Sequence, residues 1–146
     1  MQFSAPFVQL VLIALSVAVS GTPVAPTSNV LTFQEMKHWI ATTDAELTFI
    51  GTPINELSTE AAQSITVTYC SSRSQNVCGG SCTVYTGGSA CLAAPGTACL
   101  SATGDVGFCD HSGCTGSCNE YASCGTILNN GFCYTPGTKS IIVPPS

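Results

Sequence analysis

The residues best suited to chemistry in this sequence are cysteines, and they are densest in CDHSGCTGSC at positions 109–118. Thiolates and imidazoles are zinc ligands, so Cys109, His111, Cys114 and Cys118 are candidates for a metal site. In an oxidising compartment the same thiols form disulfides instead. The stretch therefore indicates either a metal protein or a disulfide-stabilised one.

The pattern around these cysteines favours disulfides over zinc. Their spacing is irregular, and the chain has no Cys-x2-Cys pair of the kind that structural zinc sites usually contain. His111 has Asp110, Ser112 and Gly113 as neighbours, which is typical of an exposed loop rather than of a fixed ligand. We therefore predict no metal site and no cofactor.

All ten cysteines lie between positions 70 and 133, and their even number allows complete pairing. The apolar residues in this segment are too few to offset the cost of ordering it, so cross-links are needed for stability. The pairing itself does not follow from the sequence. We predict that every cysteine is a half-cystine: Cys70, Cys78, Cys82, Cys91, Cys99, Cys109, Cys114, Cys118, Cys124 and Cys133.

Catalytic groups are sparse. The chain has two histidines and contains neither a Gly-x-Ser-x-Gly nucleophile motif nor a His-Glu-x-x-His metal motif. Asp105 and Asp110 could work as acid and base, and together with His111 they could serve a small extracellular hydrolase. Carboxylates in glycine-rich turns more often bond to their own backbone. We predict that the protein is not an enzyme and assign no catalytic residue.

Three tyrosines beside turn signals are candidate ligand platforms. Tyr85, Tyr121 and Tyr134 stand near glycines, where rings on rigid loops can stack on sugars or on a partner protein. A carbohydrate-binding module that uses Tyr85 and Tyr121 as a pair is therefore an alternative function.

The elements that would position these residues divide the chain into four parts. Residues 1–20 contain an uncharged apolar run, too short to span a membrane, that ends with Ala18 and Ser20 at signal-peptidase positions. Residues 21–30 read as a flexible Pro/Thr leader, 31–69 as a helix plus strands, and 70–146 as a cysteine-rich module. A signal peptide predicts a secreted, extracellular protein.

One amphipathic helix is expected near the N-terminus of the mature chain. Thr32 and Glu35 have the spacing of a capping box, and helical periodicity extends to about Thr42. Trp39 within it is expected to anchor the core rather than to bind a ligand. Alternating residues predict half-buried strands in AELTFIG and SITVTYC, with a helical turn beginning at Pro53 between them.

The cysteine-rich module reads as short strands and loops, because Gly, Ser, Asn and Pro interrupt it. KSIIVPPS predicts a short last strand. The segments CGGSCTVY at 78–85 and CTGSCNEY at 114–121 share Cys-x-Gly-Ser-Cys-x-x-Tyr, which suggests internal duplication. The expected fold class is small and disulfide-rich, mainly β and loop, with one N-terminal amphipathic helix and a few short strands.

The net charge of −5 argues against partners that are themselves anionic. Phosphate backbones and acidic lipid surfaces repel such a protein, so we predict no nucleic-acid binding and no membrane insertion.

Three stretches, TTDAELTFIG, VTYCSSRSQNVCGGSCTVY and NNGFCYTPGTKSIIV, resemble small secreted cysteine-rich proteins of basidiomycete fungi. The resemblance covers about Leu31 to Val143 and implies an effector-like protein without an established activity. Hydrophobins, hevein-type chitin binders and the CFEM module fit less well, because they use adjacent cysteines or Cys-x-Cys. We predict a secreted, non-enzymatic protein that recognises an extracellular protein or glycan, effector-like or cell-wall associated.

Overall fold

The computed structural model describes residues 29–54 and 64–145. Within these ranges it confirms the predicted fold class: a small, mostly β domain with one α-helix and five disulfides. The predicted signal peptide, most of the leader and the segment after Ile54 lie outside the described residues. The elements are α1 (Phe33–Thr42), β1 (Glu46–Gly51), β2 (Ile65–Ser74), β3 (Val77–Gly87), β4 (Ala90–Ala102), β5 (Gly107–His111), β6 (Thr115–Glu120), the 3-10 turns η1 (Tyr121–Ser123) and η2 (Asn129–Gly131), and β7 (Cys133–Val143).

Helix α1 begins where the capping box predicts. The Thr32 hydroxyl accepts the Glu35 N–H at 3.0 Å, and the Glu35 carboxylate accepts the Thr32 N–H at 2.8 Å. Each side chain thus satisfies a backbone donor that the first turn would leave unpaired. The helix ends at Thr42, as the periodicity predicted.

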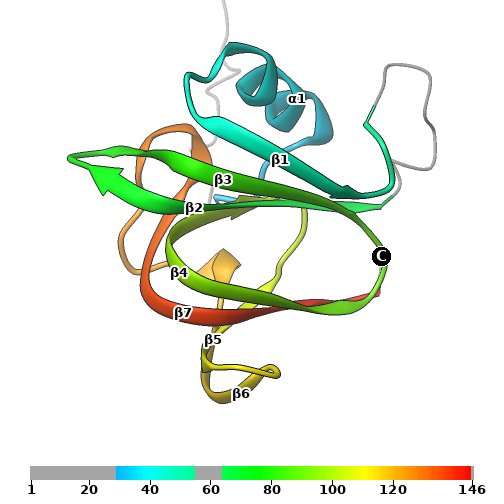
Figure 1. Cartoon of the computed structure of the whole chain (residues 1–146), viewed down its shortest axis with the longest axis vertical. Helices are drawn as coiled ribbons and strands as arrows, with labels where there is room; N and C mark the ends of the chain where they lie inside the picture. The colour runs from blue at the N-terminus through cyan, green and yellow to red at the C-terminus, as the bar shows by residue number, and fades with distance from the viewer. Residues whose placement is uncertain (1–28, 55–63, 146) are drawn as a thin grey trace, which may run out of the picture.

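The strands form a single sheet in the order β1-β3-β2-β4-β7-β5-β6. The β1–β3 pair is parallel and the other neighbours are antiparallel. Figure 1 shows α1 lying over β1 and β3, and the β5–β6 hairpin projecting at the opposite side of the molecule. The two edges of the sheet are therefore β1 and β6.

The sheet curls strongly at β4. This strand pairs with β7 from Ala90 onward and with β2 only at Cys99–Ala102, and its register is interrupted between Ala93 and Cys99. Gly96 supplies a positive φ of 74° within the interrupted stretch. Figure 1 shows β4 bending back over itself. The curl encloses the larger core cluster, formed by Ile65, Val67, Tyr69, Leu92, Ala94, Leu100, Ala102, Val106, Tyr121, Cys133, Ile141 and Val143.

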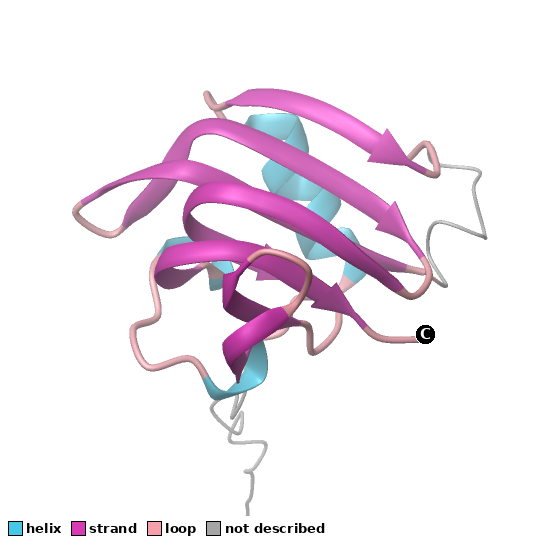
Figure 2. Cartoon of the chain, turned by 60° about the horizontal axis from the view of Figure 1, so that its bottom comes forward, coloured by secondary structure: helices cyan, strands magenta, loops and turns pink. Residues whose placement is uncertain are grey.

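Helix α1 covers the other face of the sheet (Figure 2). Trp39, 7 % exposed, meets Phe132 edge-on with ring centroids 5.0 Å apart, which confirms its predicted role as a core anchor. The sulfur of Met36 accepts the Thr68 hydroxyl at 3.2 Å. Trp39 and Phe132 belong to a second, smaller core cluster, which also contains the disulfides Cys70–Cys82 and Cys78–Cys99.

The prediction that both β1 and β2 are half-buried is wrong. The first half of β2 is more buried than expected, and β1 is less buried. The residues from Ile65 to Cys70 are buried on both faces, because the curl covers one face and α1 the other. Thr66 is fully buried and its hydroxyl bonds to that of Thr86 at 3.0 Å. Strand β1, at the sheet edge, is mostly exposed, and Phe49 retains 53 % of its surface.

The cysteine-rich region contains longer strands than its turn residues suggest. Strands β3, β4 and β7 have 11, 13 and 11 residues, and the last strand begins at Cys133 rather than near Lys139. Several glycines that read as turns lie inside strands, where they allow bulges and bends.

Candidate functional site

All ten cysteines are paired, as predicted. Cys109, Cys114 and Cys118 are half-cystines, so their sulfurs cannot hold the zinc ion that the alternative reading of 109–118 required. The five disulfides are Cys70–Cys82, Cys78–Cys99, Cys91–Cys114, Cys109–Cys118 and Cys124–Cys133.

The two Cys-x-Gly-Ser-Cys segments have the same disulfide arrangement. In each, the first cysteine bonds to strand β4: Cys78 to Cys99, and Cys114 to Cys91. The second cysteine bonds directly across its own hairpin, and both of these pairs have Cα atoms 4.0 Å apart. The likeness is one of local structure, and internal duplication stays a prediction.

Both segments also form the same β-bulge. Gly80 and Ser81 lie opposite the single residue Ser71, and Gly116 and Ser117 lie opposite Asp110. The two glycines have φ of 87° and 84°, the left-handed conformation that this type of bulge needs.

The same hydrogen bond closes both bulges. The Ser81 N–H donates to the Ser71 hydroxyl at 3.0 Å, and the Ser117 N–H donates to the Asp110 carboxylate at 2.9 Å. Asp110 therefore does what Ser71 does, which identifies a structural role for its carboxylate.

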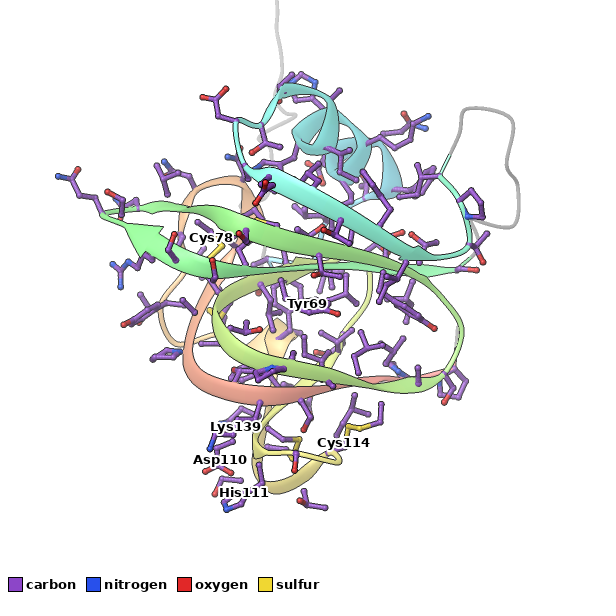
Figure 3. The ribbon with its side chains drawn as sticks, viewed as in Figure 1. Tyr69, Cys78, Asp110, His111, Cys114 and Lys139 are labelled. Atoms are coloured by element: carbon purple, nitrogen blue, oxygen red, sulfur yellow. A yellow bond between two sulfur atoms is a disulfide. The ribbon has the colours of Figure 1, made fainter. Side chains whose placement is uncertain are left out.

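Asp110 also pairs with His111, whose Nδ1 lies 2.6 Å from its Oδ1. This contact and the Ser117 N–H hold the pKa of the Asp110 carboxyl below its usual value. Both side chains are exposed, and Figure 3 shows them at the outer end of the β5–β6 hairpin. The hydrolase hypothesis thus has two of its three groups in contact.

The third group of that hypothesis has a different set of contacts. Asp105 accepts the Ala122 N–H at 2.8 Å, which ties its carboxylate to the start of η1. The hydrogen bond between the Asp105 and Glu120 carboxyl groups raises the pKa of Glu120, because such a bond requires a proton on one of them, and the repulsion between the two charges adds to this. Among the described residues, no three His, Cys, Asp or Glu side chains group as a metal site would require.

The predicted tyrosine platform must be corrected for Tyr121. Its side chain is fully buried, and its hydroxyl lies 2.6 Å from the carbonyl oxygens of Asn29 and Gly131. Burial raises its pKa far above the ordinary value. Tyr121 therefore ties Asn29 to Gly131 of η2 through its hydroxyl and cannot stack on a ligand.

The other two tyrosines are half-buried and lie apart in the fold. The Tyr85 hydroxyl donates to the Gly88 carbonyl at 2.9 Å, and its ring packs against the larger core cluster. The Tyr134 ring is stacked by the Arg73 guanidinium at 4.3 Å. No paired platform of Tyr85 and Tyr121 exists.

A surface groove that the sequence did not indicate lies between α1 and η2. Its volume is about 470 Å³, against about 280 Å³ for a cavity beside Tyr69 and 210 Å³ for one beside Asp110. We call it the α1 groove. It is lined by Leu31, Gln34, Glu35, His38, Trp39, Thr42, Asn130 and Gly131.

The α1 groove combines a fixed apolar floor with polar side chains at its rim. Trp39 and Leu31 contribute the apolar surface, whereas Gln34, His38 and Asn130 are exposed and make no side-chain hydrogen bond to a described residue. Asn130 has a φ of 62°, a left-handed backbone conformation that asparagine adopts more readily than most residues. No sequence motif indicates this groove, because its two walls are about ninety positions apart in the chain.

No helix among the described residues is long and apolar enough to cross a membrane. No protein-family model, curated protein or solved structure matches the chain.

Proposed function

We propose that this protein is a secreted, non-enzymatic recognition protein that binds its target outside the cell. The five disulfides fit a small extracellular protein, since such cross-links persist in oxidising compartments. An effector-like or cell-wall-associated role, in keeping with the resemblance to secreted fungal proteins, belongs to the same proposal.

The observation that carries the proposal is the α1 groove, whose two walls are held in place before any ligand arrives. On the helix side, Trp39 is packed against Phe132. On the η2 side, the Asn129 N–H donates to the Asn76 carbonyl at 2.9 Å, and the Leu128 N–H donates to the Phe132 carbonyl at 2.6 Å. The backbone of both walls and the Trp39 ring therefore lose little conformational entropy on binding.

The one carboxylate of the α1 groove already has a structural role. Glu35 accepts the Thr32 N–H and completes the helix cap. This contact fixes the helix side of the groove, and we propose that the groove binds its target without altering it.

Trp39 provides the test, because it is the only tryptophan in the chain and lines the groove. Fractionated extracellular material should change its fluorescence, and the ligand should be recovered unaltered. A fraction that is consumed with product formation would show an enzyme instead. If no fraction perturbs Trp39, the groove is not the recognition site.

Secretion is tested separately by the intact mass of the protein from culture fluid, before and after alkylation. The expected form begins at Gly21 and takes up no alkylating agent. Retention of residues 1–20, or labelled thiols, would contradict it.

A further inference from the structure

We infer that the α1 groove binds a neutral saccharide. This inference rests on the proposed function and specifies the ligand of the same groove.

The charge of the groove selects against ionic ligands. Its lining contains one carboxylate, Glu35, and no lysine or arginine. Phosphates, nucleotides and acidic glycans would therefore meet repulsion without a compensating cation, in a protein whose net charge is already −5. A cationic ligand would find only the Glu35 carboxylate, one oxygen of which accepts the Thr32 N–H.

The rim of the groove suits hydroxyl groups. The Gln34 and Asn130 amides each offer donors and an acceptor on one planar group, and the His38 imidazole offers both functions on its two nitrogens. A sugar hydroxyl is itself donor and acceptor, so it can satisfy either end of an amide. Because these three side chains make no hydrogen bond to described residues, no internal bond has to break first.

The floor of the groove suits the ring of a sugar rather than a lipid or an extended peptide. Trp39 is 7 % exposed, which leaves only a small apolar strip beside Leu31. Such a strip can cover the C–H groups of one ring but cannot bury an acyl chain. Extended peptides pair with strand edges, and the groove is bounded by a helix and a turn. Its volume of about 470 Å³ falls in the usual range for small-ligand sites.

The experiment measures binding of defined neutral oligosaccharides of glucose, mannose and N-acetylglucosamine by Trp39 fluorescence and by calorimetry. The parallel arms are an anionic uronic-acid oligosaccharide, a cationic glucosamine oligomer and a mixed peptide library. At least one neutral oligosaccharide should bind, and the charged ones should bind more weakly.

The variants are chosen to spare the fold. Gln34→Ala and His38→Ala place a better helix former at exposed sites, and Asn130→Gly suits a backbone with positive φ. Each should weaken binding by about two- to tenfold through a lost hydrogen bond. Lys37→Ala is the matched control on α1, because Lys37 lies over the Phe33 ring and does not line the groove.

Each outcome decides the matter. Weaker sugar binding in the three variants, with Lys37→Ala unchanged, supports the inference. Sugar binding that survives the triple variant places the site elsewhere and overturns it. A Trp39 response to peptides or charged glycans, but not to neutral ones, overturns the inference and leaves the proposed function intact. No response to any arm counts against both.

Discussion

Asp110 occupies in the β5–β6 hairpin the position that Ser71 occupies in the β2–β3 hairpin. Each side chain faces a Gly-Ser bulge next to a cross-strand disulfide and accepts the N–H of the bulge serine. The fold therefore needs one acceptor oxygen at this position, and a serine is able to supply it.

The first prediction follows from this equivalence. Asp110→Ser should retain the hairpin, whereas Asp110→Ala should lower the Tm, because the Ser117 N–H loses its acceptor. Hydrogen exchange at the Ser117 amide measures the effect locally: protection should persist in Asp110→Ser and fall in Asp110→Ala. Equal loss of protection in both variants would show that the two hairpins are not equivalent.

The second prediction concerns acid. The folded-state pKa of Asp110 is depressed, so its charged form stabilises the fold above the unfolded-state pKa, and this stabilisation is lost as the pH falls through the folded-state value. Glu120 has a raised pKa and acts with the opposite sign, so the comparison uses a Glu120→Gln background. There, the Tm of the Asp110 form should fall more steeply below about pH 4 than that of Asp110→Ser. If the Tm of both forms falls in parallel as the pH is lowered, the charged Asp110 carboxylate does not stabilise the fold.

Much of the fold could be predicted from short sequence motifs and composition. Little of the α1 groove could be predicted in this way. The capping box at Thr32 and the full pairing of the cysteines follow from short motifs and from composition. The curl does not, because it depends on pairs such as Ala90 with Val143, which are far apart in sequence. Glycine was ambiguous for the same reason: Gly116 reads as a turn residue, but its partner strand makes it a bulge.

The same limit explains the error at Tyr121. Tyr121 begins the 3-10 turn η1, and its ring could face either solvent or the core. Its burial depends on residues distant in the sequence, such as Asn29, whose carbonyl accepts its hydroxyl. The α1 groove requires α1 and η2 to lie side by side, since Trp39 and Asn130 both line it, and no periodicity in either segment indicates that arrangement.

The third prediction is an order of reduction. Both sulfurs of Cys70–Cys82 and of Cys78–Cys99 belong to residues that are at most 4 % exposed. Cys91 and Cys118 are exposed, and every residue of β6 is exposed on a strand that pairs with β5 alone. Graded reduction at neutral pH should therefore open Cys91–Cys114 and Cys109–Cys118 first, because exchange requires access to a sulfur. Alkylation followed by peptide mapping reads the order, and early loss of Cys70–Cys82 would contradict it.

The fourth prediction separates backbone strain from steric contact at the bulge. Gly113 and Gly116 both have positive φ, so alanine at either should cost about 1–2 kcal/mol. A Cβ on Gly113 meets open space, whereas one on Gly116 collides with His111 and Asp110. Gly116→Ala should therefore lower the free energy of unfolding more than Gly113→Ala does, in denaturant titrations of the oxidised protein. Equal losses would show that the Asp110 and His111 side chains move away from the new Cβ without adding to the cost of backbone strain.

The fifth prediction links the core to the α1 groove through Tyr121. Tyr121→Phe keeps the buried ring but removes the hydroxyl that faces the carbonyls of Asn29 and Gly131, and should cost about 1–3 kcal/mol of stability. Because Gly131 lines the groove, the variant should also weaken ligand binding, although Tyr121 itself does not line the groove. Tyr85→Phe is the control: its hydroxyl bonds to an exposed turn, so the change should be within about 0.5 kcal/mol. If Tyr121→Phe lowers stability but leaves binding unchanged, η2 is held by its backbone contacts to Asn76 and Phe132, and the tyrosine serves the core alone.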